Sequence, residues 1–550
     1  MRIAEVILKY LKENGVDNIY GIPAGTISPL FDSLNDVDIK PIVAKNEGGA
    51  AYMAARYASV TRKLGVCIGA GGVGVNNMMN GIADAMRAKA PVLIITGYVN
   101  RWQIGKGAIQ ELDTQNILKP ITKYSKTILD EHEVMKEFEN AIKLAYTVPM
   151  GPVHLSIPID IQLLECEETL LHNLETFDPG KVLKSDSKET TLNEEILIKA
   201  CNIINENENG VILVGKGCRG LSEQIIKLST HLQWPVITTP EGKGVVSSDY
   251  PLNYGNYGFA STDAANDCVN DVNTTCILVL GTSLGENATA NFSPSLYKGK
   301  KSIHIDWDSR ELGKVYETDV TICQDMKTAI PFMLENLDKK SKEEKEMPLL
   351  NKPTSYTNTG ISLKEFALKL PSVMPKDTYY LSDMGEFMNF IFKYLSIPEG
   401  GDFETNLNYA AMGHAIGGAV GVQLAYPNRT TAVFAGDGCF FMNGNEILTA
   451  KEYKLPIIYF IINNSMLGFV EHGHNFLFER VVDGFKQERI NISEVMKAYG
   501  VNSMQVVDIK DMDRISDFIK NSYGPLVIEI ITDGSEPAPN GDRLKSLQNR

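Results

Sequence analysis

Two turns near the C-terminus carry residue types that bind a metal ion and a phosphate. The apolar run TTAVFA ends in Gly436-Asp437-Gly438, and the next, LPIIYFII, ends in Asn463-Asn464. Parallel strands end at one edge of their sheet, so Asp437 and Asn464 would direct oxygens toward one point. Mg²⁺ prefers such oxygens together with phosphate and water, and a backbone carbonyl near Met466 could supply another. Glycine N–H groups can approach a phosphate closely. The spacing predicts an anchor for Mg²⁺ and a diphosphate.

Short apolar runs recur along the whole chain and would position such a site. They are about four to eight residues long and alternate with helical stretches, a pattern typical of buried parallel strands. At 550 residues the chain is long enough for three ordinary domains. Two polar stretches, Glu165–Asn193 and Leu337–Gly360, are typical of linkers. We expect an α/β fold of three doubly wound parallel-sheet domains, over residues 1–165, 190–337 and 361–550.

Composition excludes several classes of partner. The 53 basic and 68 acidic residues give a net charge of −15. The sequence has no cluster of Lys and Arg that could bind the phosphate backbone of a nucleic acid. The eight cysteines form no C-x-x-C pair, which fits reduced thiols in a cytosol. Cys67, Cys276 and Cys439 lie in apolar runs, where we expect them to pack in the core. The charged N-terminal segment is unlike a signal peptide, and no apolar stretch is long enough to span a bilayer. We expect a cytoplasmic protein without a nucleic-acid or membrane partner.

Glu47 follows the apolar run PIVA and begins a helix of small residues. Its plain interpretation is a helix-dipole partner, since acidic side chains stabilise the first turn of a helix. The next apolar run leads into the glycine-rich segment Gly69–Asn77 and the motif NGIADA.

The order of strand, GDG, helix, strand and NN resembles the diphosphate-binding domain of thiamine diphosphate enzymes. The order of Glu47, the glycine-rich segment and NGIADA resembles their pyrimidine-binding domain. The resemblance covers nearly the whole chain and points to the acetolactate synthase and pyruvate oxidase group. The motifs that carry it are Tyr20-Gly21-Ile22-Pro23-Ala24-Gly25, NEGGAAYMAARYA, Gln110-Glu111, GPVHLSIPIDIQ and NYAAMGHAIGGAVG.

This resemblance implies a pyrimidine-binding domain, a central Rossmann-like domain and a diphosphate-binding domain, in that order. It implies that Glu47 binds the cofactor and activates its aminopyrimidine, and that Met412 is an apolar wedge that bends it, where plain core packing is the alternative. Mg²⁺ would be held by Asp437, Asn464 and Met466. The other implied cofactor contacts are Gly25, Asn77, Ala410, Met384, Gly385, Gly436, Gly438, Cys439, Met466, Leu467 and Gly468.

Several departures from the family pattern bear on the reaction. Aldehyde-releasing decarboxylases of the family carry adjacent histidines near the position of Gln110, and this chain has no such pair. Gln110 matches the carboligating synthases, and we expect it to be catalytic. The segment from Gly281 to Glu286 lacks the arginine with which synthases grip FAD, which makes FAD doubtful. Gly473 stands where synthases have an aromatic residue, so a larger or more polar acceptor could fit.

Charged and titratable residues also differ around the expected cofactor. The segment Ser382–Phe387 stands where synthases use Gln and His on the diphosphate, so the charge of Glu386 must turn away or be neutralised. His472 and His474 are candidate proton carriers over the acceptor, because histidine titrates near neutral pH; exposed polar residues on a mobile helix are the alternative. His414 could also donate a proton, but a packed structural histidine is favoured.

We therefore predict a carboligase that resembles acetolactate synthase. It would decarboxylate a 2-oxo acid, by default pyruvate, and transfer the acyl unit to the carbonyl of a small-molecule acceptor. The alternative is a flavin-free decarboxylase that releases an aldehyde. The resemblance implies a homodimer or homotetramer whose active sites lie between subunits, with Glu47 from one chain and the metal anchor from another.

Overall fold

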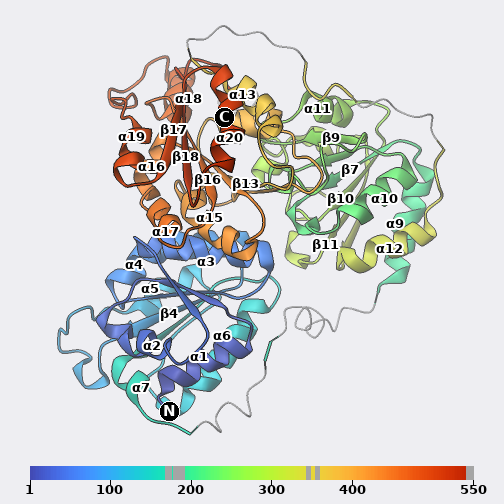
Figure 1. The fold of residues 1–550 in the computed structure, drawn as a ribbon. Helices are drawn as coiled ribbons and strands as arrows, with labels where there is room; N and C mark the ends of the chain where they lie inside the picture. The colour runs from blue at the N-terminus through green and yellow to red at the C-terminus, as the bar shows by residue number, and fades with distance from the viewer. Residues whose placement is uncertain (168–175, 178–191, 342–347, 353–359, 540–550) are drawn as a thin grey trace.

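The computed structural model describes residues 1–167, 176–177, 192–341, 348–352 and 360–539. Three six-stranded sheets, in which every pairing of neighbouring strands is parallel, follow one another along the chain (Figure 1). This confirms the predicted α/β class with three parallel-sheet domains. Most of the two predicted linkers, Glu165–Asn193 and Leu337–Gly360, falls outside the described residues, as does the end of the chain from residue 540.

The first domain has the strand order β2-β1-β3-β4-β6-β5. These strands span Lys40–Val43, Asn18–Gly21, Gly65–Gly69, Val92–Tyr98, Val153–Pro158 and Tyr124–Thr127. The helices α1 to α7 cover both faces and span Ile3–Glu13, Ser28–Ser33, Glu47–Thr61, Val73–Ala88, Thr114–Leu118, Val134–Tyr146 and Ile159–Leu163. The central strands β3 and β4 are buried along their whole length, as expected for a sheet covered on both sides.

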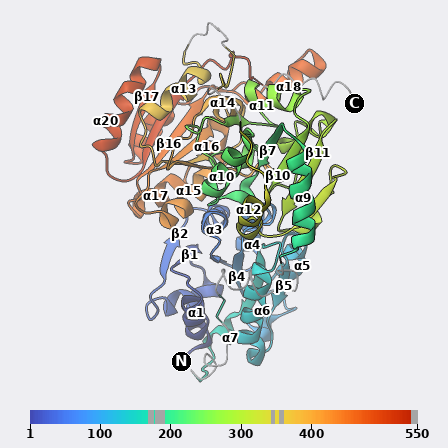
Figure 2. The same cartoon turned by 90° about the vertical axis from the view of Figure 1, so that its right-hand side faces the viewer.

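The central domain has the order β12-β11-β10-β7-β8-β9. These strands span Val320–Cys323, Lys301–Asp306, Cys276–Leu280, Gly210–Val214, Val236–Thr238 and Asn253–Asn256. Its helices α9, α10, α11 and α12 span Glu194–Glu206, Ser222–Leu232, Asp263–Asn270 and Met326–Asn336. Turning the molecule by 90° brings this domain to the front, beside the third domain and above the first (Figure 2).

The third domain has the order β14-β13-β15-β16-β18-β17. These strands span Asp402–Glu404, Tyr379–Ser382, Thr431–Gly436, Ile457–Asn463, Leu526–Ile531 and Asn502–Val506. The helices α13 to α20 span Leu363–Lys369, Met388–Tyr394, His414–Ala425, Asp437–Asn443, Glu446–Glu452, Gly468–Phe478, Ile492–Ala498 and Ile515–Lys520. The apolar strand β16 is fully buried and pairs with β15 and β18, which places the predicted metal anchor in the middle of the sheet.

Helices α3 and α15 pack closely and join the first domain to the third (Figure 1). A Cβ at Gly421 would lie 2.1 Å from the carbonyl oxygen of Met53, and one at Gly418 would lie 2.3 Å from Cγ of Arg56. Only glycine permits this approach of the two backbones. One hydrophobic cluster, which includes Ala54 and Ala419, runs through both domains.

A buried group of charges links all three domains. The Arg56 guanidinium pairs with Asp84 in the first domain and with Glu404 in the third, at 3.0 Å in the latter case. Arg219 of the central domain pairs with the same Glu404. Asn406 donates to Asp84 Oδ1 at 2.9 Å. Because each carboxylate has a cationic or amide partner, the charges are tolerated in the interior.

The described residues also bear on the composition. The eight cysteines all lie in the described ranges and form no disulfide there, and Cys67, Cys276 and Cys439 are buried, as expected for core packing. In the described ranges no helix combines the length and the apolar character needed to cross a membrane.

Candidate active site

A cavity of about 300 Å³ opens at the carboxyl edge of the third sheet, where β13, β15 and β16 end. It brings together the predicted metal ligands and most predicted cofactor contacts, namely Met384, Gly385, Ala410, Met412, Gly436, Asp437, Gly438, Cys439, Asn464, Met466, Leu467 and Gly468. Every residue that lines it lies between Ile361 and Glu536, so one chain builds this cavity from its third domain alone.

Asp437 connects two adjacent strand ends in this cavity. Its Oδ1 accepts a hydrogen bond from the backbone N–H of Gly438 and its Oδ2 from that of Ser465, both at 2.8 Å. Only 9% of the residue is exposed, and burial raises the pKa of its carboxyl group. No ion pair among the described residues includes Asp437. The charge of Arg489 offsets this rise only in part, and a bound cation would further relieve the cost of burying the carboxylate.

The two asparagines after β16 point in different directions. Asn463 is buried and donates to Glu529 Oε1 at 2.6 Å and to the carbonyl of Ile490 at 2.9 Å. Asn464 lines the cavity, and its Oδ1 accepts from the N–H of Met466 at 3.1 Å. Ser465 between them has a left-handed φ of 58°, which costs a non-glycine residue about 1 to 3 kcal/mol. Asn463 holds the turn, and Asn464 faces the site.

These residues fit Mg²⁺ bound together with a diphosphate. The oxygens of Asp437 and Asn464 each keep a lone pair beyond the hydrogen bonds described, and the carbonyl of Met466 adds a third kind of oxygen ligand. Within the part of the chain that the structure describes, no three His, Cys, Asp or Glu side chains gather as a metal group. A metal here would therefore depend on amide, carbonyl and phosphate oxygens besides one carboxylate.

Asp383 supports the opposite wall and was not predicted. It follows β13, is fully buried and accepts the N–H groups of Met384, Gly413 and Ala415 at 2.8, 2.8 and 2.9 Å. Burial raises the pKa of this carboxyl group to about 6. The three bonds fasten the turn at Met384 to the first residues of α15. An aspartate directly after an apolar run was the signal that could have revealed it.

Met412 lies between the core and the cavity. A Cβ at Gly438 would lie 3.1 Å from Met412 Cε, so the side chain covers that glycine. It also packs against two of the hydrophobic clusters. Ala410, two residues earlier, has a left-handed φ of 61°. Cys439 is buried, and its Sγ donates to the carbonyl of Met384 at 2.9 Å, which ties the GDG turn to the Met384 turn.

Glu386 lines the cavity and is paired with His472. Its Oε1 lies 2.6 Å from His472 Nδ1, and this hydrogen bond raises the pKa of the imidazole. Glu386 thus stays on the cavity wall and has a titratable partner there. His474 is directed elsewhere: its Nδ1 lies 2.6 Å from the carbonyl of Arg480. Neither histidine lines the cavity.

His414 is buried within α15. It stacks at an angle on Tyr52, with ring centroids 6.5 Å apart, and neither ring nitrogen has a hydrogen-bond partner among the described atoms. Burial lowers its pKa well below the usual value. A neutral, packed histidine agrees with the favoured structural interpretation.

The remaining predicted residues gather at the carboxyl edge of the first sheet, outside the cavity. Glu47 begins α3, and its Oε2 accepts from Asn77 Nδ2 at 2.9 Å. Gln110 has a left-handed φ of 67°, and its carbonyl lies 2.9 Å from where a Cβ of Gly72 would be. Gly25 begins a short 3₁₀ helix after β1. A single chain therefore presents two groups of site residues, one in each of two domains.

Comparison with known proteins follows the same division into three parts. Models of the thiamine pyrophosphate enzymes match residues 1–117 with the N-terminal TPP binding domain, 197–333 with the central domain and 383–530 with the C-terminal TPP binding domain. The chain belongs to the thiamine pyrophosphate enzymes. Thiamine pyrophosphate is the thiamine diphosphate of the sequence prediction, and this confirms the predicted family.

Several relatives of this thiamine pyrophosphate enzyme are similar over nearly their full length. The probable acetolactate synthase large subunit of Methanocaldococcus jannaschii is 30% identical, over 100% of this chain and 95% of the relative. The acetolactate synthase large subunit of Lactococcus lactis is 29% identical, over 97% and 93% of the two chains. The large subunit of acetolactate synthase isozyme 2 of Escherichia coli is 28% identical, over 98% and 96%.

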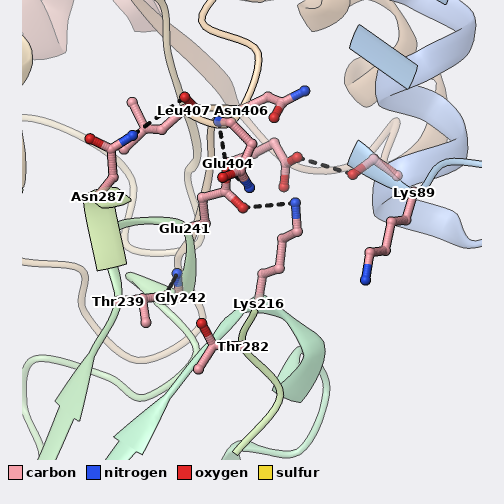
Figure 3. A network of polar contacts seen from close by, with 12 residues as sticks. Lys89, Lys216, Thr239, Glu241, Gly242, Thr282, Asn287, Glu404, Asn406 and Leu407 are labelled. Carbon is pink, nitrogen blue, oxygen red and sulfur yellow. Dashed lines mark hydrogen bonds and ion pairs between the residues drawn. The ribbon is translucent and has the colours of Figure 1, made fainter. Parts of the chain in front are cut away.

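A second cavity of this thiamine pyrophosphate enzyme, about 640 Å³ in volume, lies between the three domains. One carboxylate on its wall has two polar partners: Lys216 Nζ lies 2.7 Å from Glu241 Oε2, and Asn408 donates to Glu241 Oε1 at 2.9 Å. Figure 3 shows Lys216 extending toward Glu241, and Asn287 toward the main chain of Leu407. Ser283 lies on this wall, in the segment from Gly281 to Glu286 that lacks the FAD-binding arginine of the synthases.

Proposed function

We propose that this protein is a carboligase like acetolactate synthase, dependent on thiamine diphosphate and Mg²⁺. It would decarboxylate a 2-oxo acid, pyruvate in the first instance, and transfer the acyl unit to the carbonyl group of an acceptor. The observation that carries the proposal is the cavity in which Asp437 and Asn464 meet at two strand ends. The names of the full-length relatives, all acetolactate synthases, support the choice of reaction.

The chain's own residues would divide the work between binding and proton control. Asp437, Asn464 and the Met466 carbonyl would hold Mg²⁺ on the diphosphate, and the glycines of the GDG turn would let the phosphates approach the backbone. Glu47 would bind a ring nitrogen of the aminopyrimidine through its carboxyl group. When bound, the cofactor supplies the electron sink that makes loss of CO₂ from a 2-oxo acid feasible. Met412 would keep water from the ring.

We place the working active site between two copies of the chain. In one chain the cavity receives no residue of the first domain, so Glu47 and Gln110 would have to come from a partner. Apolar side chains near both groups of residues support such an interface. They are exposed in the single chain and include Val73 and Ile109 in the first domain and Phe441 and Met442 in the third. A homodimer or homotetramer would bury them.

Carboligation is favoured over aldehyde release. Gln110 stands where the aldehyde-releasing branch has histidines, and none of the relatives named above is a decarboxylase. Nothing in the cavity favours the lyase alternative. Gln110, His472 and His474 would act near the acceptor, and His474 would have to leave the carbonyl of Arg480 to do so.

We further propose that the protein works without FAD. The segment from Gly281 to Glu286, which lines the second cavity, has no arginine such as the synthases have there. Elsewhere on the wall Glu241 adds a carboxylate, held by Lys216 and Asn408. The absorbance spectrum of the purified protein between 350 and 500 nm tests this directly. A stoichiometric flavin released on denaturation would refute it.

The proposed reaction is tested by incubating the protein with pyruvate, thiamine diphosphate and Mg²⁺ and identifying the products by mass. A panel of acceptors with larger or more polar groups than pyruvate extends the test to the space beside Gly473. Acetolactate or a mixed acyloin is the expected product. Acetaldehyde alone, with no carbon–carbon bond formed to any acceptor, would refute carboligation.

A further inference from the structure

Glu386 brings a carboxylate to the wall of a cavity proposed to hold a diphosphate. Its side chain is 11% exposed and contacts the N-terminus of α18, where a Cβ at Gly468 would lie 2.6 Å from Glu386 Oε2. Because glycine has no Cβ, Gly468 leaves room for the carboxylate of Glu386. Placed beside the phosphates, an unpaired carboxylate would repel them, and the low effective dielectric of a buried site strengthens that repulsion.

His472 lies one helical turn after Gly468 on α18, and its ring reaches back to Glu386. The 2.6 Å separation between Nδ1 and Oε1 is short for a nitrogen–oxygen pair, as expected when both groups are charged. The other charged groups that act on the imidazole are Glu471 on the same helix and Lys486 on the segment packed against it. Glu386 is the main one.

We propose that His472, as an imidazolium, neutralises Glu386 and thereby permits the diphosphate to bind, so that cofactor affinity depends on this ion pair. The inference rests on the proposed function of the cavity. It assigns His472 a positioning role in the third domain, which is separate from proton transfer to an acceptor. The pair also connects the turn at Met384–Phe387 to α18, so the wall of the diphosphate site and the helix after the asparagine turn are held together.

Substitutions at both positions distinguish neutralisation of Glu386 from a purely structural role of His472. His472→Asn removes the positive charge and leaves Glu386 facing the phosphates, so the Kd for thiamine diphosphate should rise about tenfold or more. In the double variant Glu386→Gln/His472→Asn the negative charge is gone as well, and the Kd should return to within about threefold of the parent value. His472→Lys, which keeps a cation without an imidazole, should bind more tightly than His472→Asn.

The experiment is calorimetric titration of the cofactor-free full chain with thiamine diphosphate at saturating Mg²⁺ and pH 7. His132→Asn, an exposed histidine of the first domain, is the matched control and should leave the Kd unchanged. Circular dichroism and the unfolding temperature without cofactor establish that each variant is folded. Should His472→Asn alone be misfolded, the comparison of Glu386→Gln/His472→Asn with Glu386→Gln carries the same test.

Two results would overturn the inference while leaving the proposed function intact. One is parent-like affinity in His472→Asn, and the other is a double variant as weak as His472→Asn, which would show that the imidazole is needed for itself. Failure of the parent protein to bind thiamine diphosphate and Mg²⁺ would instead overturn the proposed function, and the inference with it.

Discussion

The carboxylate of Asp437 and the backbone N–H of Ser465 form a 2.8 Å hydrogen bond across the ends of β15 and β16. This bond orients Asp437 from a residue that lies 28 positions later in the chain. Ser465 adopts a left-handed φ to make it, and Asn464 is thereby turned toward the cavity. The geometry of the proposed metal site is therefore set before any ligand binds.

Asp437→Asn should weaken cofactor binding without unfolding the protein. The amide keeps the size of the side chain and an acceptor for one backbone N–H, but loses the charge that a divalent cation needs. We expect the Kd for thiamine diphosphate in saturating Mg²⁺ to rise about 100-fold, or about 2.8 kcal/mol. Calorimetry measures it, with Asp517→Asn on exposed α20 as the control. A rise of less than threefold would argue against a metal at this position.

Glu47→Gln should separate turnover from folding. The amide can still contact Asn77 but cannot exchange a proton with the cofactor ring, so the rate of product formation should fall by about 100- to 10,000-fold. Initial rates with pyruvate at saturating cofactor give this number, and Glu13→Gln, at an exposed position of α1, should be silent. Unchanged turnover would indicate that Glu47 only stabilises the first turn of α3.

Arg56→Met should destabilise the packing between the domains. It leaves the carboxylate of Asp84 without its cation and removes one of two from Glu404, and breaking a buried pair costs about 3 to 5 kcal/mol. The shift of the first unfolding transition in urea measures the loss. Arg514→Met removes an exposed pair and should change stability by less than about 0.5 kcal/mol. Equal effects of the two changes would contradict the buried network.

His414→Phe should be tolerated. Both imidazole nitrogens are buried without partners, so an apolar ring of similar shape should leave the free energy of unfolding unchanged or raise it by about 1 kcal/mol. Turnover should also persist. If the variant folds normally but loses activity, His414 donates a proton after all.

The pH dependence of stability should differ between the parent protein and His472→Asn. Pairing with Glu386 raises the folded-state pKa of His472 above its unfolded value. Its contribution is therefore full below about pH 6.5 and is lost as the pH rises through the folded-state pKa. About a third of the side chain is exposed, so the difference should stay under about 1 kcal/mol. Unfolding midpoints of both proteins at pH 6 and pH 9 provide the comparison. A difference between the two midpoints that is larger at pH 9 than at pH 6 would contradict the prediction.

The sequence predicted the buried strands well and the short ones poorly. Runs such as those of β10 and β16 are apolar throughout because helices cover both faces of the sheet. The strands β5, β9, β12, β14 and β17 were not anticipated, and each lies at a sheet edge and is short or polar, as in the segments YSKT and DFE. At such positions strand formation depends on the neighbouring strand more than on the residues themselves. The short strand β13 was also not anticipated, although it is buried and lies inside the third sheet.

The site shows a similar limit. Asp437 and Asn464 were recognisable because each directly follows an apolar run, and a residue directly after a parallel strand lies at the carboxyl edge of the sheet. The partner of Glu386 was not, because His472 is 86 residues away and meets it only through the packing of α18. Asp383 was missed although it directly follows β13, because two of the three backbone N–H groups that it accepts, those of Gly413 and Ala415, come from a distant part of the chain.

The tight contact of α3 with α15 has a consequence for assembly. Because no side chain separates Gly421 from Met53, the first and third domains of one chain have little freedom to slide, and Glu47 stays at a fixed spacing from Asp437. In the proposed twofold pairing, a second chain that completes one catalytic centre must then complete the other at the same moment. Half-assembled dimers with a single working centre are geometrically forbidden, and activity should rise in step with dimer concentration.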